Sequence, residues 1–140
     1  MCVEDVEMIM KEDFVMTGSD GSGMMLDAVG VPHPRNFGTF PCFLRLAREH
    51  KLCDLQTAIY RITKKSADII GITDRGVLME GKAADITIFD GETIADQATY
   101  KNPFAGAKGL YHVIVNGEMA IENGEQTAVR AGKFLRKTEM

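Results

Sequence analysis

The stretch Phe14-Val15-Met16-Thr17-Gly18-Ser19-Asp20-Gly21 joins a short apolar run to a carboxylate that glycines flank. Four or five consecutive apolar residues fit one buried strand, and the glycines allow a sharp turn directly after it. In α/β enzymes, reactive groups lie where such strands end. The stretch therefore predicts a strand over residues 14–19 and makes Asp20 the first candidate for chemistry, although Ser-Asp-Gly is also an ordinary turn sequence.

The composition excludes several classes of protein. The chain has 140 residues, of which 45% are apolar and 26% charged, as is typical of a globular protein. A net charge of −4 argues against a nucleic-acid partner, and the apolar runs are too short to cross a membrane. The first residues lack the pattern of a signal peptide, and the three cysteines are not closely spaced. We therefore expect reduced thiols in a cytoplasmic protein.

The first half of the chain has helical periodicity. Apolar residues recur at helical spacing and predict helices over residues 3–11, 40–50 and 55–70. The last of these regions is expected to end in a separate short turn over residues 67–70, which Ser66 caps and Gly71 ends. Thr39 is the expected N-cap of the second helix, with Pro41 in its first turn, and Asp54 is the expected cap of the third. The residues between 18 and 38 are rich in glycine and proline, which predicts a long loop.

The pattern changes to short strands after residue 72. Asn116-Gly117 lies between two apolar runs and predicts a tight hairpin, because both central residues of a type I′ turn need a positive φ. Asn123-Gly124 predicts a second turn. The expected strands cover residues 76–81, 85–90, 112–115, 118–121 and 133–137. The predicted architecture is thus α/β in residues 1–72, followed by an all-β tail in residues 73–140.

The predicted strand over residues 14–19 has no neighbour in the helical half. A strand buried on both faces needs neighbouring strands. It could pair with the strands of the tail, or its neighbours could lie in sequence outside this chain. An exposed apolar strand is also an edge that favours pairing between copies, so we expect self-association.

Several short blocks of sequence carry a resemblance to a known family. They are Gly18-Ser19-Asp20-Gly21, His33-Pro34-Arg35, Gly38-Thr39-Phe40-Pro41, Asp74-Arg75-Gly76, Gly81-Lys82-Ala83-Ala84-Asp85-Ile86, Thr93-Ile94-Ala95-Asp96 and Val113-Ile114-Val115-Asn116-Gly117. With these blocks the chain resembles the C-terminal portion of the N-acyl-D-amino-acid deacylases, the D-aminoacylase branch of the amidohydrolase superfamily. Cys42 departs from the pattern, because the family usually has an arginine after Gly-Thr-Phe-Pro.

The resemblance implies a fold larger than this chain. Residues 1–72 would be the C-terminal piece of a (β/α)8 metal-dependent hydrolase barrel, with residues 14–19 as its last strand. Residues 73–140 would be part of a small β-sandwich. The complete enzyme would hold zinc through histidine and cysteine ligands that this chain lacks. The three histidines here, His33, His50 and His112, are scattered, so we expect no metal to be bound by this chain alone.

The resemblance also implies roles for individual residues. Asp20 would be the catalytic general acid and base, and it could contact a second metal. Arg35 and His33 would lie in a substrate-binding loop, where a guanidinium suits a substrate carboxylate. The alternatives are a salt bridge within the loop for Arg35 and a backbone-capping role for His33.

The implied reaction is the hydrolysis of the linear amide of an N-acyl-D-amino acid. The isolated chain is expected to be inactive, because it carries the general base without the zinc ligands. The alternative is a non-catalytic β-sandwich remnant of an amidohydrolase that binds a partner.

Overall fold

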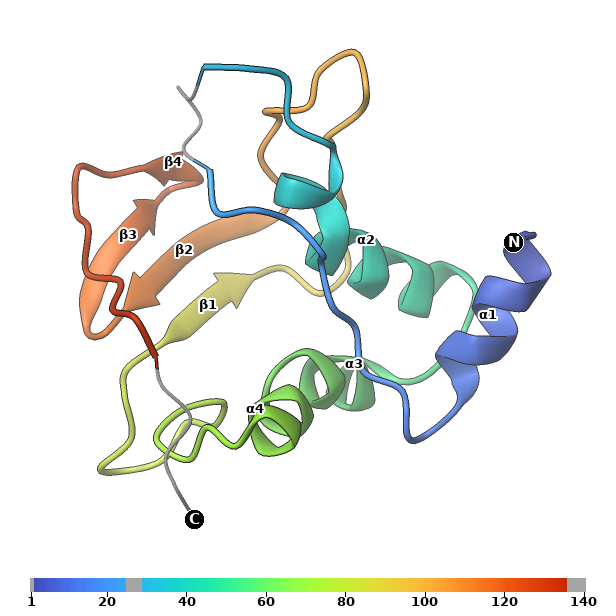
Figure 1. Ribbon diagram of the computed structural model, residues 1–140, viewed down its shortest axis with the longest axis horizontal. Coiled ribbons are helices and arrows are strands. Elements are labelled where there is room, and N and C mark those ends of the chain that lie inside the picture. Colours follow the sequence, from blue (N-terminus) through green and yellow to red (C-terminus); the bar gives the residue numbers. More distant parts are fainter. Residues whose placement is uncertain (1, 25–28, 136–140) are drawn as a thin grey trace.

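The computed structural model describes residues 2–24 and 29–135, and it places four helices beside one antiparallel sheet (Figure 1). The helices are α1 (Val3–Lys11), α2 (Arg35–Glu49), α3 (Leu55–Ile62) and α4 (Lys64–Ile70), and the strands are β1 (Ile86–Phe89), β2 (Leu110–Val115), β3 (Glu118–Glu122) and β4 (Glu125–Gln126). A helical half followed by a β tail is therefore confirmed. The division into two domains at residue 72 stays a prediction.

The sheet is a meander in the order β1-β2-β3-β4, with every neighbouring pair antiparallel. Its central turn is the predicted one, because Asn116 has a φ of 49° and Gly117 a φ of 85°. The second turn repeats this geometry, with 52° at Asn123 and 82° at Gly124. Both turns follow from local chemistry, since asparagine tolerates the left-handed region and glycine enters it freely.

The predicted starts of the helices are partly right. The first helix covers residues 3–11 as expected, and the Asp54 carboxylate accepts a hydrogen bond from the Thr57 N–H at 2.7 Å, which confirms this cap. The second helix begins at residue 35 instead of 40, so Thr39 is not its cap and Pro41 lies inside it. In the extra turn the Gly38 N–H bonds to the Pro34 carbonyl at 2.9 Å, and Gly38 is buried, where a Cβ would lie 3.4 Å from the Asp96 side chain.

The helical region predicted over residues 55–70 contains two helices, and Gly71 ends the second with a φ of 78°, as expected, but the second helix begins at Lys64 and is not capped by Ser66. Thr63 leaves the helical region with φ −126° and ψ −95°, and it separates α3 from α4. The Thr63 hydroxyl donates to the Ile59 carbonyl at 2.7 Å, and the Ser66 hydroxyl donates to the Arg61 carbonyl at 2.8 Å. These side chains satisfy carbonyls that an unbroken helix would pair with its own N–H groups, which makes the break possible.

The strand predicted over residues 14–19 does not form within the described residues. Residues 15–20 belong to no strand or helix, and Phe14 is 77% exposed. The prediction of a buried strand is wrong for the described residues, because a strand requires a hydrogen-bonded neighbour and they supply none at that place.

Two further predicted strands do not form within the part of the chain that the structure describes. Residues 76–81 form turns, in which the Lys82 N–H bonds to the Met79 carbonyl at 3.1 Å and the Ala83 N–H to the Asp74 carbonyl at 2.8 Å. These local bonds use backbone groups that a strand would offer to a neighbour. Residues 133–135 are also outside any strand, and the last part of that prediction, residues 136–137, lies outside the described residues.

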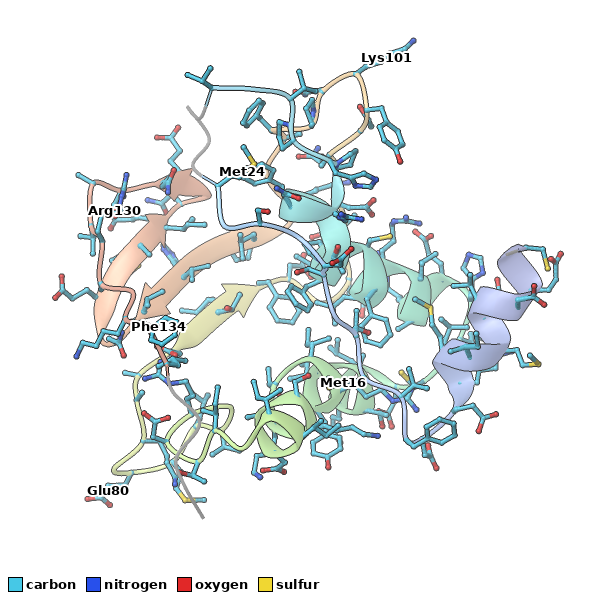
Figure 2. The ribbon with its side chains drawn as sticks, in the orientation of Figure 1. Met16, Met24, Glu80, Lys101, Arg130 and Phe134 are labelled. Atoms are coloured by element: carbon cyan, nitrogen blue, oxygen red, sulfur yellow. The ribbon has the colours of Figure 1, made fainter. Side chains whose placement is uncertain are left out.

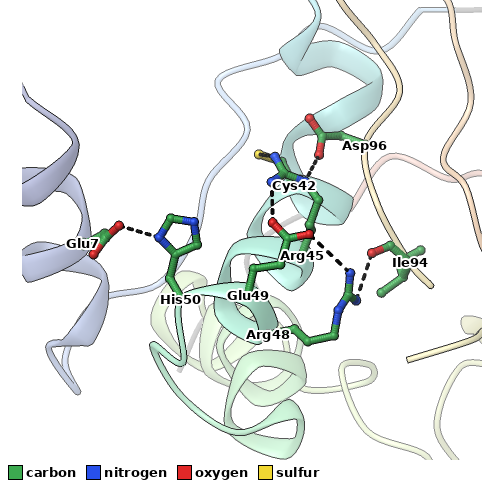
Figure 3. A network of polar contacts seen from close by, with 8 residues as sticks. All are labelled: Glu7, Cys42, Arg45, Arg48, Glu49, His50, Ile94 and Asp96. Atoms are coloured by element: carbon green, nitrogen blue, oxygen red, sulfur yellow. Dashed lines mark hydrogen bonds and ion pairs between the residues drawn. The ribbon is translucent and has the colours of Figure 1, made fainter. Parts of the chain in front are cut away.

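The core lies where the helices meet the segment that follows β1. Its buried side chains are Phe43, Leu44, Ala47, Ala58 and Ile94, so residues from both halves of the chain share one core. Figure 3 shows two arginines of α2 that hold the later segment in place. Arg45 Nε donates to the Asp96 carboxylate at 2.8 Å, and Arg48 donates to the carbonyls of Gly91 and Ile94 at 3.0 and 3.1 Å.

Among the described residues, no helix is long and apolar enough to cross a bilayer.

The first prediction concerns the central hairpin turn. Gly117→Val places a β-branched side chain at a φ of 85° and should destabilise the chain by on the order of 1–3 kcal/mol. Thermal unfolding followed by circular dichroism measures this as a lower Tm. Gly132→Val is the control, because a Cβ there meets nothing within 4 Å and the backbone is not in the left-handed region. Equal Tm values for the two variants would contradict the assigned turn.

Candidate functional site

Asp20 and Arg35 meet in the structure, as a site built from both requires. An ion pair joins Arg35 Nη1 to Asp20 Oδ2 at 3.2 Å, and the two side chains are 44% and 88% exposed. Asp20 ends the extended segment, and Arg35 is the first residue of α2. An exposed pair of this kind adds little to the stability of the fold.

The backbone around Asp20 aims its carboxylate toward the start of α2. Asp20 has a φ of 47°, a conformation that aspartate tolerates better than most residues. The Ser19 hydroxyl accepts a hydrogen bond from the Gly21 N–H at 3.2 Å. Gly21 passes so close to α2 that a Cβ there would lie 3.1 Å from the Asn36 Cα. The glycine after the carboxylate therefore lets the loop approach the helix.

His33 holds the backbone of Arg35. Its Nδ1 accepts a hydrogen bond from the Arg35 N–H at 3.1 Å, and its Nε2 lies 2.9 Å from the Tyr100 hydroxyl. Since Nδ1 accepts, the neutral ring carries its proton on Nε2 and donates it to the tyrosine oxygen. The structure thus brings all three predicted site residues together. It also shows the two contacts that were the alternatives to substrate binding, namely the ion pair of Arg35 and the hydrogen bond from the Arg35 N–H to the His33 ring.

Tyr100 is a neighbour of the site that the sequence did not indicate. It lies 67 positions from His33, and the two rings meet edge to face with centroids 5.1 Å apart and planes at 78°. A second aromatic contact joins the same two regions, with the centroids of Phe37 and Phe104 5.7 Å apart. No motif or periodicity marked these residues, because their role depends on a long-range contact alone.

The surroundings of Cys42 disfavour its thiolate, the form that acts as a nucleophile. It is half-buried, and Arg45 Nη2 lies 3.5 Å from its Sγ (Figure 3). Burial raises the pKa of the Cys42 thiol above its ordinary value, and the nearby Asp96 carboxylate raises it further. Burial also raises the pKa of the Cys53 thiol. Both thiols are therefore held in their protonated, less reactive form.

The described residues do not assemble a metal site. Within residues 2–24 and 29–135, no three side chains of His, Cys, Asp or Glu come together in a way that could hold a metal ion. Two of the histidines make structural contacts elsewhere: His50 Nδ1 lies 2.5 Å from the Glu7 carboxylate, and His112 Nδ1 accepts from the Asn123 N–H at 3.3 Å.

A hollow of about 450 Å³ lies away from Asp20, between α2, α3 and residues 91–92. It is lined by Leu44, Ala47, Arg48, Lys51, Cys53, Asp54, Leu55, Ala58, Gly91 and Glu92. None of the predicted site residues lines it, so it gives no support to their proposed chemistry.

Comparison with known proteins connects this arrangement to hydrolases. The amidohydrolase family profile matches residues 7–121. The N-acyl-D-aspartate deacylase of Alcaligenes xylosoxydans xylosoxydans is 39% identical over 133 residues, which are 94% of this chain and 26% of that protein. The D-aminoacylase of the same organism is 38% identical, over 96% of this chain and 27% of that protein.

Solved structures agree with the sequence matches. A crystal structure of D-aminoacylase, described as defining a novel subset of amidohydrolases, superposes with a TM-score of 0.84 at 38% identity and covers 94% of this chain and 27% of that chain. The N-acyl-D-glutamate deacylase of Bordetella bronchiseptica, complexed with zinc and a phosphonate inhibitor, superposes with a TM-score of 0.76 at 36% identity, over 90% of this chain and 27% of that chain. This chain therefore spans about a quarter of the length of these relatives.

The class defined by this fold and these matches is that of the amidohydrolases, and the chain belongs to the amidohydrolase family. Its resemblance to the N-acyl-D-amino-acid deacylases is confirmed by 39% identity over nearly its whole length.

The contact between His33 and Tyr100 can be tested by NMR. In Tyr100→Phe the ring contact remains but the hydroxyl is lost, so the ¹⁵N shifts of the His33 ring should move and the Arg35 amide should exchange faster. Tyr111→Phe is a matched control, because Tyr111 is an exposed tyrosine of β2. Unchanged His33 ring signals in Tyr100→Phe would show that the two side chains do not interact.

The cysteines should differ in reactivity. Alkylation with iodoacetamide at mildly alkaline pH should modify the exposed Cys2 before Cys42 and Cys53, whose raised thiol pKa values leave less thiolate. Mass spectrometry of peptides over time measures the order, and Cys2→Ser should remove the fast phase. A fast phase assigned to Cys42 would contradict the burial described here.

Proposed function

We propose that this chain supplies the acid-base carboxylate and a substrate-binding arginine of a zinc-dependent enzyme that hydrolyses N-acyl-D-amino acids. The observation that supports this most is the pairing of Asp20 with Arg35 at 3.2 Å, within a chain 39% identical to an N-acyl-D-aspartate deacylase. A substrate of this class has an amide to be cleaved and a free carboxylate beside it. Asp20 would act on the amide, and Arg35 would bind the carboxylate.

Asp20 would move the proton. A water oxygen attacks the amide carbonyl carbon, and the Asp20 carboxylate accepts the proton that this water loses. Asp20 then delivers the proton to the amide nitrogen as the C–N bond breaks, which yields a carboxylate and a D-amino acid. The position suits this role, because the Asp20 side chain is 88% exposed and its backbone is held by the turn at Ser19 and Gly21.

Arg35 would bind the carboxylate of the substrate. Its planar guanidinium can form two parallel hydrogen bonds with a carboxylate, and it already contacts one in Asp20. A substrate carboxylate would occupy the donors that Asp20 leaves free. His33 would position Arg35 through the hydrogen bond to its backbone N–H, and Tyr100 would orient the His33 ring.

The described residues of this chain do not by themselves provide the ligands of a zinc site. The related N-acyl-D-glutamate deacylase is described with zinc, whereas the described part of this chain brings no three candidate ligands together. Zinc ligands would have to come from the three quarters of such an enzyme that this chain does not cover. Asp20, exposed and at the end of its segment, is the residue here that could contact a second metal.

Two measurements test this function. The isolated chain with added zinc should not hydrolyse N-acetyl-D-aspartate, because the residues that the structure describes do not form a metal site. A fusion in which this chain replaces the matched quarter of the N-acyl-D-aspartate deacylase should hydrolyse it, and Asp20→Asn should lower kcat by about 100-fold or more.

Matched variants separate the proposed roles. In the fusion, Arg35→Lys should chiefly raise KM, since an ammonium cannot form the bidentate contact. A folded, zinc-bearing fusion that Asp20→Asn leaves fully active would rule out the acid-base role. A fusion without substitutions that folds and holds zinc but is inactive would favour the alternative of a non-catalytic remnant that binds a partner.

A further inference from the structure

We infer that Asn123 is a site of spontaneous deamidation in the folded chain, whereas Asn116, which has the same local sequence, is protected by the fold. Two of the four asparagines precede glycine, at Asn116-Gly117 and Asn123-Gly124. Glycine favours the reaction because it has no Cβ to keep its backbone nitrogen away from the asparagine side chain. This inference concerns the β tail and does not depend on the proposed function.

The reaction needs no reagent other than water. The Gly124 backbone nitrogen attacks Cγ of Asn123 and forms a new C–N bond, while the bond from Cγ to the side-chain nitrogen breaks. Ammonia leaves with the proton of the Gly124 N–H, and a cyclic imide remains. Water then adds to one of the two imide carbonyls and opens the ring, which yields aspartate or its β-linked isomer. The reaction therefore requires an asparagine side chain that can rotate and a glycine N–H that is released from its hydrogen bond.

The backbone of the two turns does not distinguish them. The φ values are 49° and 52° at the two asparagines, and 85° and 82° at the glycines that follow them. Both glycine N–H groups are bonded, that of the first turn to the Ala84 carbonyl at 3.0 Å and that of the second to the Tyr111 carbonyl at 2.8 Å. A difference in rate must therefore come from the restraint on each side chain and from the free energy needed to open each turn.

The Asn116 side chain is held at both of its polar atoms. Its Nδ2 donates to the Ala131 carbonyl at 2.7 Å, and its Oδ1 accepts from Arg75 Nη2 at 3.3 Å. The Asn116 N–H also donates to the Asp85 carboxylate at 2.8 Å. Ala131 belongs to the segment that follows β4 and runs back beside the sheet, where Figure 2 labels Arg130. Rotation of the amide toward the next backbone nitrogen would break contacts with two distant segments.

The Asn123 side chain has no such restraint. It is exposed, and its amide forms no hydrogen bond with another described residue, although its backbone N–H donates to His112 Nδ1 at 3.3 Å. Its turn leads into β4, a strand of two residues at the outer edge of the sheet (Figure 1). Because short edge segments with few contacts open at a low free energy, the Gly124 N–H should be released here more often than its counterpart in the central hairpin.

The products would change the turn in two ways. A carboxylate at position 123 would stand between the exposed Glu122 and Glu125 and would add one negative charge to a chain whose formal net charge is −4. The β-linked isomer would also lengthen the main chain of the turn by a methylene group. Since β3 and β4 pair only as Ile121 with Gln126 and Glu122 with Glu125, the pairing should be lost in that form.

The test follows both asparagines in the same sample of the folded chain. After incubation in a mildly alkaline buffer, mass spectrometry of peptides, with chromatographic separation of the aspartate and β-linked forms, measures the conversion of each site. Asn123 should convert at least about tenfold faster than Asn116. The same chain in concentrated urea is the control, because without the fold the two sites should convert at similar rates.

A variant tests the protection of Asn116 directly. Arg75→Met removes the hydrogen bond to Asn116 Oδ1, so Asn116 should convert faster while the rate at Asn123 stays the same. Circular dichroism checks that this variant is folded, and the two sites of the unsubstituted chain decide the inference if it is not. Equal rates at the two sites of the folded chain, or no conversion of Asn123 over a time in which it converts in urea, would overturn the inference. A folded Arg75→Met chain with an unchanged rate at Asn116 would overturn the protection assigned to these contacts.

Discussion

The contact between α2 and residues 90–96 is the interaction on which the rest of the structure depends. Phe43, Leu44 and Ala47 of α2 are buried together with Ile94, and Arg45 pairs with Asp96 beside them. This contact joins the helical half to the sheet, because residues 90–96 follow β1 directly. It also fixes the direction of α2, whose first residue is Arg35. The candidate site therefore takes its position from a core contact at the other end of the same helix.

A second arginine has a comparable task at the edge of the fold. Arg61 of α3 is 3% exposed and donates to the carbonyls of Met10 and Lys11 at the end of α1. Terminal carbonyls of a helix have no partner within the helix, so the guanidinium satisfies groups that would otherwise face water. These hydrogen bonds join α3 to the end of α1. The extended segment that ends at Asp20 follows α1 in the chain.

The features predicted correctly from the sequence depend on a few neighbouring residues. The hairpin at Asn116-Gly117 needs two residues that accept a positive φ, and the cap at Asp54 needs a carboxylate three positions before an N–H. The failures depend on residues far away. Residues 14–19 have the composition of a strand but no neighbouring strand among the described residues, and the unexpected first turn of α2 brings Gly38 close to Asp96 of a distant segment. Asp20 was a candidate from the apolar run that precedes it, and a family resemblance added Arg35 and His33, whereas Tyr100 is absent from every motif.

The residues for which catalysis and substrate binding are proposed need less surrounding structure than a metal site does. Asp20, Arg35 and His33 come from one loop and the first turn of one helix, so local geometry and the contact at Tyr100 are enough to arrange them. A metal site has a stricter requirement, because several donors must converge on one point and each must be held by a rigid element. An extended segment whose backbone has no ladder cannot supply that rigidity. The same missing neighbours that leave residues 14–19 unpaired thus also leave the Asp20 carboxylate without the surroundings that its proposed chemistry needs.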